Sequence, residues 1–366
     1  MAYDFAHGNG TEESPFEVWT AEDLDGVRDH SGSYFVQKAH IDLESWGYWS
    51  PIAIGTWNND FECVYDGQGF EIRNLTCNDN ESNWACGLFG QVGDMVLEDI
   101  HLVNISCTGS GYVAGLISYT TGETTIKKCS VSGTLIGEDD CGGLVGSLWN
   151  GPHVIEDCHT HGSITGDTNG GLIGSVTQNT DTAIRRCFST MDVQGPERLG
   201  GLFGTVMSTS DGSVLIEECS AHGTVTSAGN TVGGFISYCN YPVIKNCYAS
   251  GAVEGNQRVG GFIGRIGWGT TSATLERDGA TFEHCYARGS VTGNDLIGGF
   301  AGIDDPTKHQ STEPLPTIID HCFYDSAEAG VSHNNVATPK TTAEMKTQAT
   351  FTDWNFDDIW AIDSHE

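Results

Sequence analysis

Short apolar runs of three to six residues recur along this chain, separated by Gly, Asn, Asp, Ser and Thr. Such runs predict strands and turns, because none is long enough for a core helix. A four-residue phrase, Gly-(Leu or Phe)-apolar-(Gly or Ser), recurs at steps of 27 to 38 residues, most often 28. A period of this size predicts stacked coils, each burying its apolar face against the next. The phrase begins at Gly87, Gly115, Gly143, Gly171, Gly201, Gly234, Gly261 and Gly299.

A second phrase consists of an apolar residue, two mostly charged residues and a cysteine. Down the chain its polar pairs are Lys-Lys, Glu-Asp, Arg-Arg, Glu-Glu, Lys-Asn, Glu-His and Asp-His. In coils that stack in register, these pairs become cross-strand neighbours on the solvent face, where opposite charges attract and like charges repel. The alternating sign therefore predicts in-register stacking. The phrase ends at Cys129, Cys158, Cys187, Cys219, Cys247, Cys285 and Cys322.

The chain has 13 cysteines but no CxxC pair and no Cys/His cluster with the spacing of zinc ligands. We therefore expect no metal site. Free cysteine behaves as a small hydrophobic residue, so the seven repeated cysteines are predicted to form an inward-facing ladder. Stacked coils would bring cysteines close enough for an occasional disulfide.

The Gly phrase resembles the GLUG motif between residues 87 and 302, with Ser118 and Ser237 in place of the last Gly. The resemblance implies an all-β fold, a right-handed parallel β-helix (β-solenoid) with coils of about 28 residues. It is similar to segments of surface proteins, adhesins, non-catalytic parts of protease precursors and viral structural proteins. The motif carries no catalytic residue, so the resemblance transfers no active site.

Three parts are expected along the chain. Residues 1–86 form an N-terminal cap and the first coils, residues 87–325 the GLUG-type β-helix, and residues 326–366 a C-terminal cap with a short helix. A capping-box pattern at Thr20 predicts a short helix through Arg28, and Thr341 begins another through Ala349. Such caps cover terminal coils that would otherwise expose unpaired backbone groups.

Acidic residues far outnumber basic ones, with 49 Asp and Glu against 16 Lys and Arg and a formal net charge of −33. An evenly acidic surface favours a protein adapted to high salt, where ions screen its self-repulsion; an ordinary acidic surface protein is the alternative. The charge opposes binding to nucleic acid. No apolar run reaches the length of a membrane span, and no secretory signal pattern opens the chain.

The sequence offers few catalytic candidates. Asp139-Asp140 and Asp304-Asp305 are adjacent acids in predicted turns, which we interpret as solvated. No Ser/His/Asp order, P-loop or HExxH motif is present, so the chain is predicted to be non-enzymatic and to need no cofactor. Four aromatic residues fall near one corner, just past the Gly phrase, where they either bind sugar rings or a partner, or seal the corner. They are Tyr119, Trp149, Tyr238 and Trp268.

These features together favour a structural protein of a virion surface, such as a tail fibre, spike or capsid vertex turret of a halophilic archaeal virus. Virion assembly inside the cell requires no export signal. Such a protein is expected to be a homo-oligomer, a trimer or pentamer, in contact with other virion proteins. Its host partner would be a surface glycan or S-layer glycoprotein, without membrane insertion. The alternatives are an exported adhesin of the cell surface and a polysaccharide-degrading tailspike.

Overall fold

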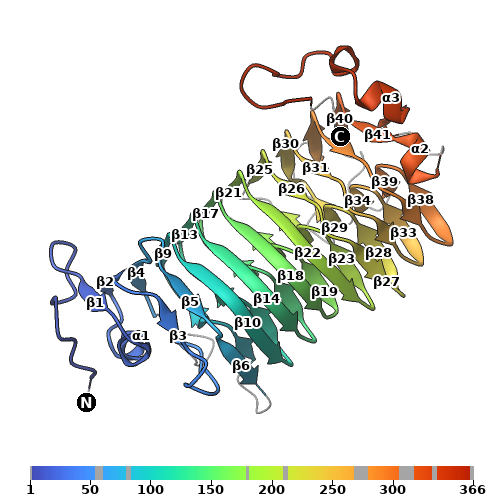
Figure 1. The fold of residues 1–366 in the computed structure, drawn as a ribbon. Coiled ribbons are helices and arrows are strands. Elements are labelled where there is room, and N and C mark those ends of the chain that lie inside the picture. Colours follow the sequence, from blue (N-terminus) through green and yellow to red (C-terminus); the bar gives the residue numbers. More distant parts are fainter. Residues whose placement is uncertain are drawn as a thin grey trace, which may run out of the picture.

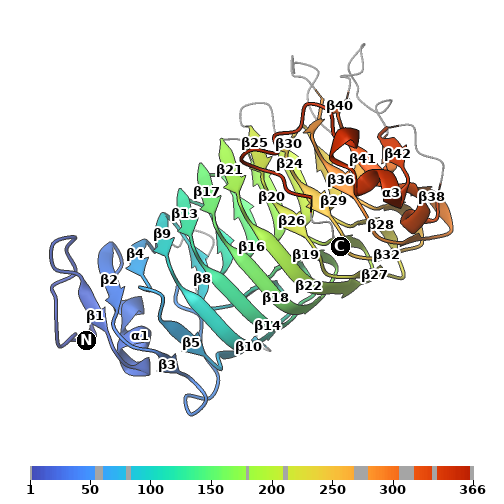
Figure 2. The same cartoon turned by 45° about the horizontal axis from the view of Figure 1, so that its top comes forward.

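A computed structural model describes residues 2–53, 61–79, 84–178, 181–208, 213–267, 279–304, 317–331 and 336–362. The chain is a parallel β-solenoid of about seven turns with coils of about 29 residues, 52% strand and 6% helix, which confirms the predicted fold class. Figures 1 and 2 show the coils stacked from the N-terminal to the C-terminal end as one elongated body.

Each coil contributes strands to four parallel sheets, A to D, whose strands are given in spatial order for the described residues. Sheet A contains β1 (Phe16–Val18), β2 (Ser33–Gln37), β4 (Cys63–Asp66), β9 (Met95–Glu98), β13 (Thr124–Lys127), β17 (His153–Glu156), β21 (Thr182–Arg185), β25 (Val214–Glu217), β30 (Val243–Lys245), β35 (Thr281–Glu283) and β40 (Ile318–Asp320).

Sheet B follows sheet A in each coil. Its main path contains β3 (Ile41–Asp42), β5 (Glu71–Arg73), β10 (His101–Gly109), β14 (Ser130–Ile136), β18 (His159–Thr165), β22 (Phe188–Gly195), β26 (Ser220–Ala221), β31 (Tyr248–Ala249), β36 (Tyr286–Ala287), β41 (Phe323–Asp325) and β42 (Thr338–Lys340). Beside this path lie β6 (Thr76–Asp79), β27 (Val225–Ser227), β32 (Val253–Glu254) and β37 (Val291–Thr292).

Sheets D and C complete each coil and are joined by the Gly phrase. Sheet D contains β7 (Ala85–Cys86), β11 (Tyr112–Ala114), β15 (Asp140–Gly142), β19 (Thr168–Gly170), β23 (Arg198–Gly200), β28 (Asn230–Gly233), β33 (Gln257–Gly260) and β38 (Asp295–Gly298). Sheet C contains β8 (Phe89–Val92), β12 (Ile117–Thr120), β16 (Val145–Trp149), β20 (Ile173–Gln178), β24 (Phe203–Ser208), β29 (Ile236–Asn240), β34 (Ile263–Ile266) and β39 (Ala301–Asp304).

Helices occur only near the ends of the described chain. Thr20 caps α1 (Ala21–Gly26) in a capping box with Asp23, and η1 (Val27–Asp29) continues it, as predicted. At the other end lie α2 (Ser326–Ala329), α3 (Thr342–Met345) and η3 (Gln348–Thr350). The predicted second helix begins at Thr341, which forms a capping box with Glu344, but the helix breaks after one turn instead of running on to Ala349.

The Gly phrase is required by a close approach between sheets C and D. A Cβ on Gly174 would lie 2.6 Å from the carbonyl oxygen of Gly146 and 2.8 Å from the backbone nitrogen of Cys141. Real Cβ contacts of this length do not occur, so at Gly174 the backbones can approach this closely only because the side chain is missing. Where serine replaces this Gly, its hydroxyl bonds the backbone; Ser237 Oγ donates to the Thr231 carbonyl at 2.7 Å.

The repeated cysteines face inward, as predicted. All seven are buried and carry free thiols, and the Sγ of Cys187 lies 3.1 Å from the Arg185 carbonyl oxygen two residues before it. The residue before each of them has a positive φ, between +49° and +57°. This left-handed residue turns the chain sharply from sheet A into sheet B. The residues in this conformation are Lys128, Asp157, Arg186, Glu218, Asn246, His284 and His321.

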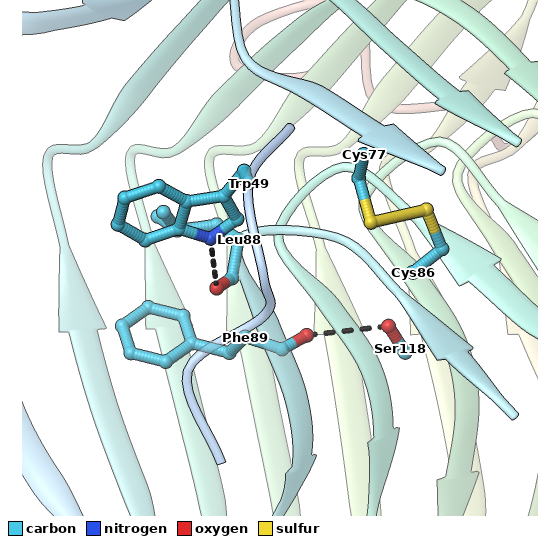
Figure 3. The surroundings of a disulfide bond; sticks show 6 residues. All are labelled: Trp49, Cys77, Cys86, Leu88, Phe89 and Ser118. Atoms are coloured by element: carbon cyan, nitrogen blue, oxygen red, sulfur yellow. Dashed lines mark hydrogen bonds between the residues drawn. A yellow bond between two sulfur atoms is a disulfide. The ribbon is translucent and has the colours of Figure 1, made fainter. Parts of the chain in front are cut away.

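A disulfide joins Cys77 to Cys86 in the first full coil (Figure 3). Nearby, the Trp49 indole nitrogen donates to the Leu88 carbonyl at 3.1 Å, and the Ser118 hydroxyl donates to the Phe89 carbonyl at 3.2 Å. These bonds connect the N-terminal cap and the next coil to the first Gly phrase. The disulfide therefore joins β6 to β7 in the coil on which the regular stack begins.

The predicted charge ladder is confirmed. Lys127, Glu156, Arg185 and Glu217 are register partners in successive strands of sheet A. Glu156 lies between two cations, 3.4 Å from Lys127 Nζ and 3.4 Å from Arg185 Nη1. The neighbouring ladder pairs Arg186 Nε with Asp157 Oδ1 at 2.7 Å.

Reversing the central pair should destabilise the stack. Replacing Arg185 and Arg186 by Glu turns three successive coils acidic, and we expect unfolding free energy to fall by about 1–2 kcal/mol at low salt. Lysine at both positions keeps the sign and is the matched control. Thermal unfolding at low and high salt measures the effect, since salt screens exposed charges. An unchanged midpoint for the Glu variant at low salt would contradict the register.

The free thiols give a second test. Under denaturing, non-reducing conditions the protein should expose eleven reactive thiols, and thirteen after reduction. A Cys77→Ser, Cys86→Ser variant should expose eleven in both states. A wild-type count below eleven before reduction would show bridges within the inward ladder.

Candidate functional site

Three of the four predicted aromatic residues lie on sheet C. Tyr119 on β12 and Trp149 at the end of β16 come together, with ring centroids 6.0 Å apart and nearly perpendicular planes. Tyr238 on β29 shares a ladder with Tyr119 but lies four coils further along. Trp268 lies outside the described residues. The structure therefore supports one aromatic pair and a separate tyrosine, rather than one row of four.

Tyr119 and Trp149 lie at the corner where sheets D and C meet. Tyr112 on β11 adds a third ring, with its centroid 4.9 Å from that of Tyr119. Asp140 on β15 accepts a hydrogen bond of 2.5 Å from the Ser175 hydroxyl. The Ser147 hydroxyl lies 2.8 Å from that of Ser175. We call these six residues the corner cluster: Tyr112, Tyr119, Asp140, Ser147, Trp149 and Ser175.

The interpretation of Asp139-Asp140 as a solvated pair is wrong for Asp140. Asp139 is exposed, but Asp140 is partly buried in the corner cluster. Burial raises the pKa of Asp140 to about 6, although the Ser175 hydrogen bond and the charge of Arg198 act in the opposite direction. Of the second pair, the Asp304 side chain and Asp305 lie outside the described residues.

The corner cluster places buried hydroxyls beside aromatic rings. Ser147 and Ser175 are buried and bonded to each other, and Ser175 is bonded to Asp140. An Asp140 carboxyl with a pKa of about 6 can hold a proton in mildly acidic solution. Burial raises the pKa of the Tyr119 phenol above its usual range, so it remains a neutral donor. No cluster of three metal-ligating side chains occurs among the described residues.

Sequence analysis missed a second row of rings, on the outer side of sheet B. His159 and Phe188 are register partners, with centroids 4.9 Å apart and planes within 5°. Tyr248 and Tyr286 repeat this geometry at 4.9 Å and 5°. Between these pairs Ser220 occupies the ladder position, and the His222 ring fills the gap, 6.4 Å from Phe188 and 5.2 Å from Tyr248.

We call His159, Phe188, His222, Tyr248 and Tyr286 the outer stripe. It crosses five coils, and its rings range from half-buried to exposed, with Phe188 at 39% exposure. Hydrogen bonds to Ser220 and Ser250 hold the His222 ring. Burial lowers the pKa of His159 and of His222, which keeps both rings uncharged at neutral pH. The stripe could have been found in the sequence, because four of its residues directly follow a cysteine of the repeated phrase. They are His159, Phe188, Tyr248 and Tyr286.

The comparisons with known proteins give relatives but no family. No family model matches the chain. It is 29% identical over 99% of its length to a protein of Evansella cellulosilytica described as "Putative Gly-rich membrane protein", and covers 45% of that protein. It is 33% identical over 153 residues, 38% of its length, to Halomucin of Haloquadratum walsbyi, and covers 2% of it. The chain thus spans less than half the length of either relative.

A solved structure corrects one expectation. The fold superposes with a TM-score of 0.51 on a protein described as "a putative immunoglobulin A1 protease" from Bacteroides ovatus, over 96% of this chain and 91% of that one, at 20% identity. The same fold therefore occurs in a protein described as an enzyme, and the prediction of a non-enzymatic class is wrong. At this identity the likeness shows the fold alone and assigns no catalytic residue.

One further observation concerns membranes. Among the described residues, no helix has the length and apolar content needed to span a bilayer.

The raised pKa of Asp140 predicts a pH-dependent stability. Below the ordinary pKa of 3.8 both folded and unfolded states hold the proton, so the group contributes nothing. As pH rises from 3.8 to about 6 the unfolded state releases its proton first, and stability is lost. Above pH 6 the ionised Asp140 carboxylate lowers the free energy of unfolding by about 2 kcal/mol, after allowance for its partial exposure.

Asp140→Asn removes this titration. We expect the variant to unfold at a higher temperature than the wild type at pH 8, and at nearly the same temperature at pH 4. Asp139→Asn, at an exposed carboxylate, is the matched control and should leave the pH profile unchanged. A difference between wild type and Asp140→Asn that is equal at both pH values would contradict the burial of this charge.

Proposed function

We propose that the chain is a β-helical module of a protein displayed on a cell surface, and that it binds extended polysaccharide along the outer stripe. The observation that carries this proposal is the spacing of the rings. His159 and Phe188, like Tyr248 and Tyr286, repeat at the strand spacing and lie nearly parallel. A polymer laid along the stack axis meets a ring surface at successive coils.

The chemistry of the stripe suits sugars. Aromatic side chains combine a broad apolar face with a polar edge, and the apolar faces of sugar rings pack on such surfaces. The Tyr248 hydroxyl lies 3.4 Å from His222 Nε2, beside the rings, where it can also bond a sugar hydroxyl. Because the histidines are neutral near pH 7, binding along the stripe does not depend on their charge.

The relatives support a surface setting. One is described as a membrane protein and the other is Halomucin, and both are longer proteins of which this chain matches a part. The excess of 49 acidic over 16 basic residues supports a salty medium. The virion-surface role, with its oligomer and host S-layer partner, rests on the sequence alone and stays a prediction, as does the GLUG resemblance.

Removing rings should weaken polymer binding. His159→Ala with Phe188→Ala should lower affinity for a polysaccharide by about tenfold or more, which corresponds to about 1.4 kcal/mol. Affinity electrophoresis in gels containing hydroxyethyl cellulose or alginate measures this change. Val96→Ala, at an apolar residue of sheet A that is 42% exposed, is the matched control. Equal retardation of all three proteins would overturn the proposal, and release of reducing sugar or cleavage of added protein would reveal an enzyme.

A further inference from the structure

A cavity of about 240 Å³ lies at the C-terminal end of the outer stripe. Tyr248 and Tyr286 line it from sheet B, while Trp354 and Trp360 line it from the C-terminal segment, residues 342–362, which we call the strap. Figures 1 and 2 show this segment folded back against the last coils. The volume is smaller than that of pockets for drug-sized ligands, so it fits one small ring.

The aromatic walls are held in place by bonds to the solenoid. Trp354 Nε1 donates to the His321 carbonyl at 3.2 Å, and Trp360 Nε1 donates to the Asn246 side-chain oxygen at 3.4 Å. The two indoles pack together with centroids 4.5 Å apart, and Trp360 lies 5.7 Å from Tyr286. Since these contacts lie within the protein and fix the rings, binding would need little ordering of the walls.

Two cations line the same cavity. Arg288 follows β36 and Lys346 follows α3, and both side chains are exposed. Neither has a carboxylate within ion-pairing distance among the described residues, in contrast to the arginines of the sheet A ladder, which are paired. With no ion-pairing carboxylate among the described residues, these two cations can pair with an anionic ligand.

Two carboxylates also line the cavity. Asp325 is only 1% exposed and is engaged by the backbone nitrogens of Ala327 and Glu328 and by the Thr342 hydroxyl, at 3.0 to 3.1 Å. It caps α2 and is not available to a ligand. Glu328 is exposed and can accept hydrogen bonds from sugar hydroxyls.

We propose that this cavity binds a sugar ring that carries an anionic group, with a uronic acid as the simplest case. The ring would lie in the cavity against the tyrosine and tryptophan side chains that line it, and its carboxylate would pair with Arg288 and Lys346. Glu328 would accept hydrogen bonds from the ring hydroxyls. The inference rests on the proposed function, because the cavity shares Tyr248 and Tyr286 with the outer stripe. It adds a preference for acidic units that the stripe alone does not supply.

The chain as a whole carries a net charge of −33, so a preference for anionic sugars depends on the two cations that line this cavity. Most of the acidic surface repels an anionic polymer at low ionic strength, but screening limits this repulsion to about 8 Å at physiological salt. Pairing inside a cavity is screened less than pairing on the open surface. Binding of an acidic sugar is therefore expected at moderate salt.

Titration of the whole chain with small sugars tests the inference. Methyl glucuronide should bind at least about tenfold more tightly than methyl glucoside, a ratio typical of one charge-assisted contact, as followed by calorimetry or by ligand-observed NMR. Arg288→Ala with Lys346→Ala should abolish the difference. Lys38→Ala, which removes a cation near the N-terminal end, should keep it. Glucose 6-sulfate and free acetate show whether the anion must be a carboxylate and must be carried by a sugar.

Two results would overturn the inference: equal affinity for the uronide and the neutral glycoside, or no binding of either at millimolar concentration. His159→Ala with Phe188→Ala separates the two proposals. If that variant loses polymer binding while the wild type shows no uronide preference, the stripe stands and the cavity assignment fails. If uronide binding persists but polymer retardation never depends on Phe188, the cavity assignment stands and the stripe fails.

Discussion

In-register stacking of coils is the constraint on which the rest of this structure depends. Because each strand pairs with the strand one coil away, every position in the repeat becomes a ladder along the molecule. Lys127, Glu156 and Arg185 follow one another at steps of 29 residues in sequence, yet they lie side by side. The side chain at each position of a ladder must therefore be compatible in size and charge with the equivalent side chains of the two adjacent coils.

Two corners of the coil limit which sequences can satisfy that stacking. At the Gly phrase, the backbones of sheets C and D approach so closely that a Cβ at Gly174 has no room. At the other corner a left-handed residue turns the chain before each inward cysteine. This conformation costs ordinary residues about 1 kcal/mol, and charged residues such as Arg186 adopt it. Packing of the inward cysteine and pairing across the outer ladder, as between Arg186 and Asp157, stabilise the corner against that cost.

The sequence was sufficient to predict the coil period, the inward cysteines, the alternating charges and the two helix starts at Thr20 and Thr341. Each of these depends on spacing or on local chemistry. The left-handed corner was not predicted, since Lys128, Arg186 and Glu218 are of types that rarely adopt that conformation, although Asn, Asp and His occupy the other corner positions. The burial of Asp140 could not be predicted either, because Ser175, its partner, lies 35 residues away and meets it only through the angle between two sheets. The contact between the strap and the solenoid could not be predicted for the same reason, because Trp360 and Asn246 are 114 residues apart.

The outer stripe shows how a structural repeat can become a binding surface. Inward positions are restricted by packing, whereas the position after each cysteine faces outward and is free to vary, as Ser130, His159 and Phe188 illustrate. Rings at this position are therefore separated by the distance between neighbouring strands. A polymer that contacts several of them gains affinity through linked weak contacts, since each additional contact is intramolecular once the first is made. Weak binding of a single sugar unit at the strap is therefore compatible with tight binding of a long polysaccharide. The number of coils that carry a ring in the outer stripe determines the length of polymer that is bound.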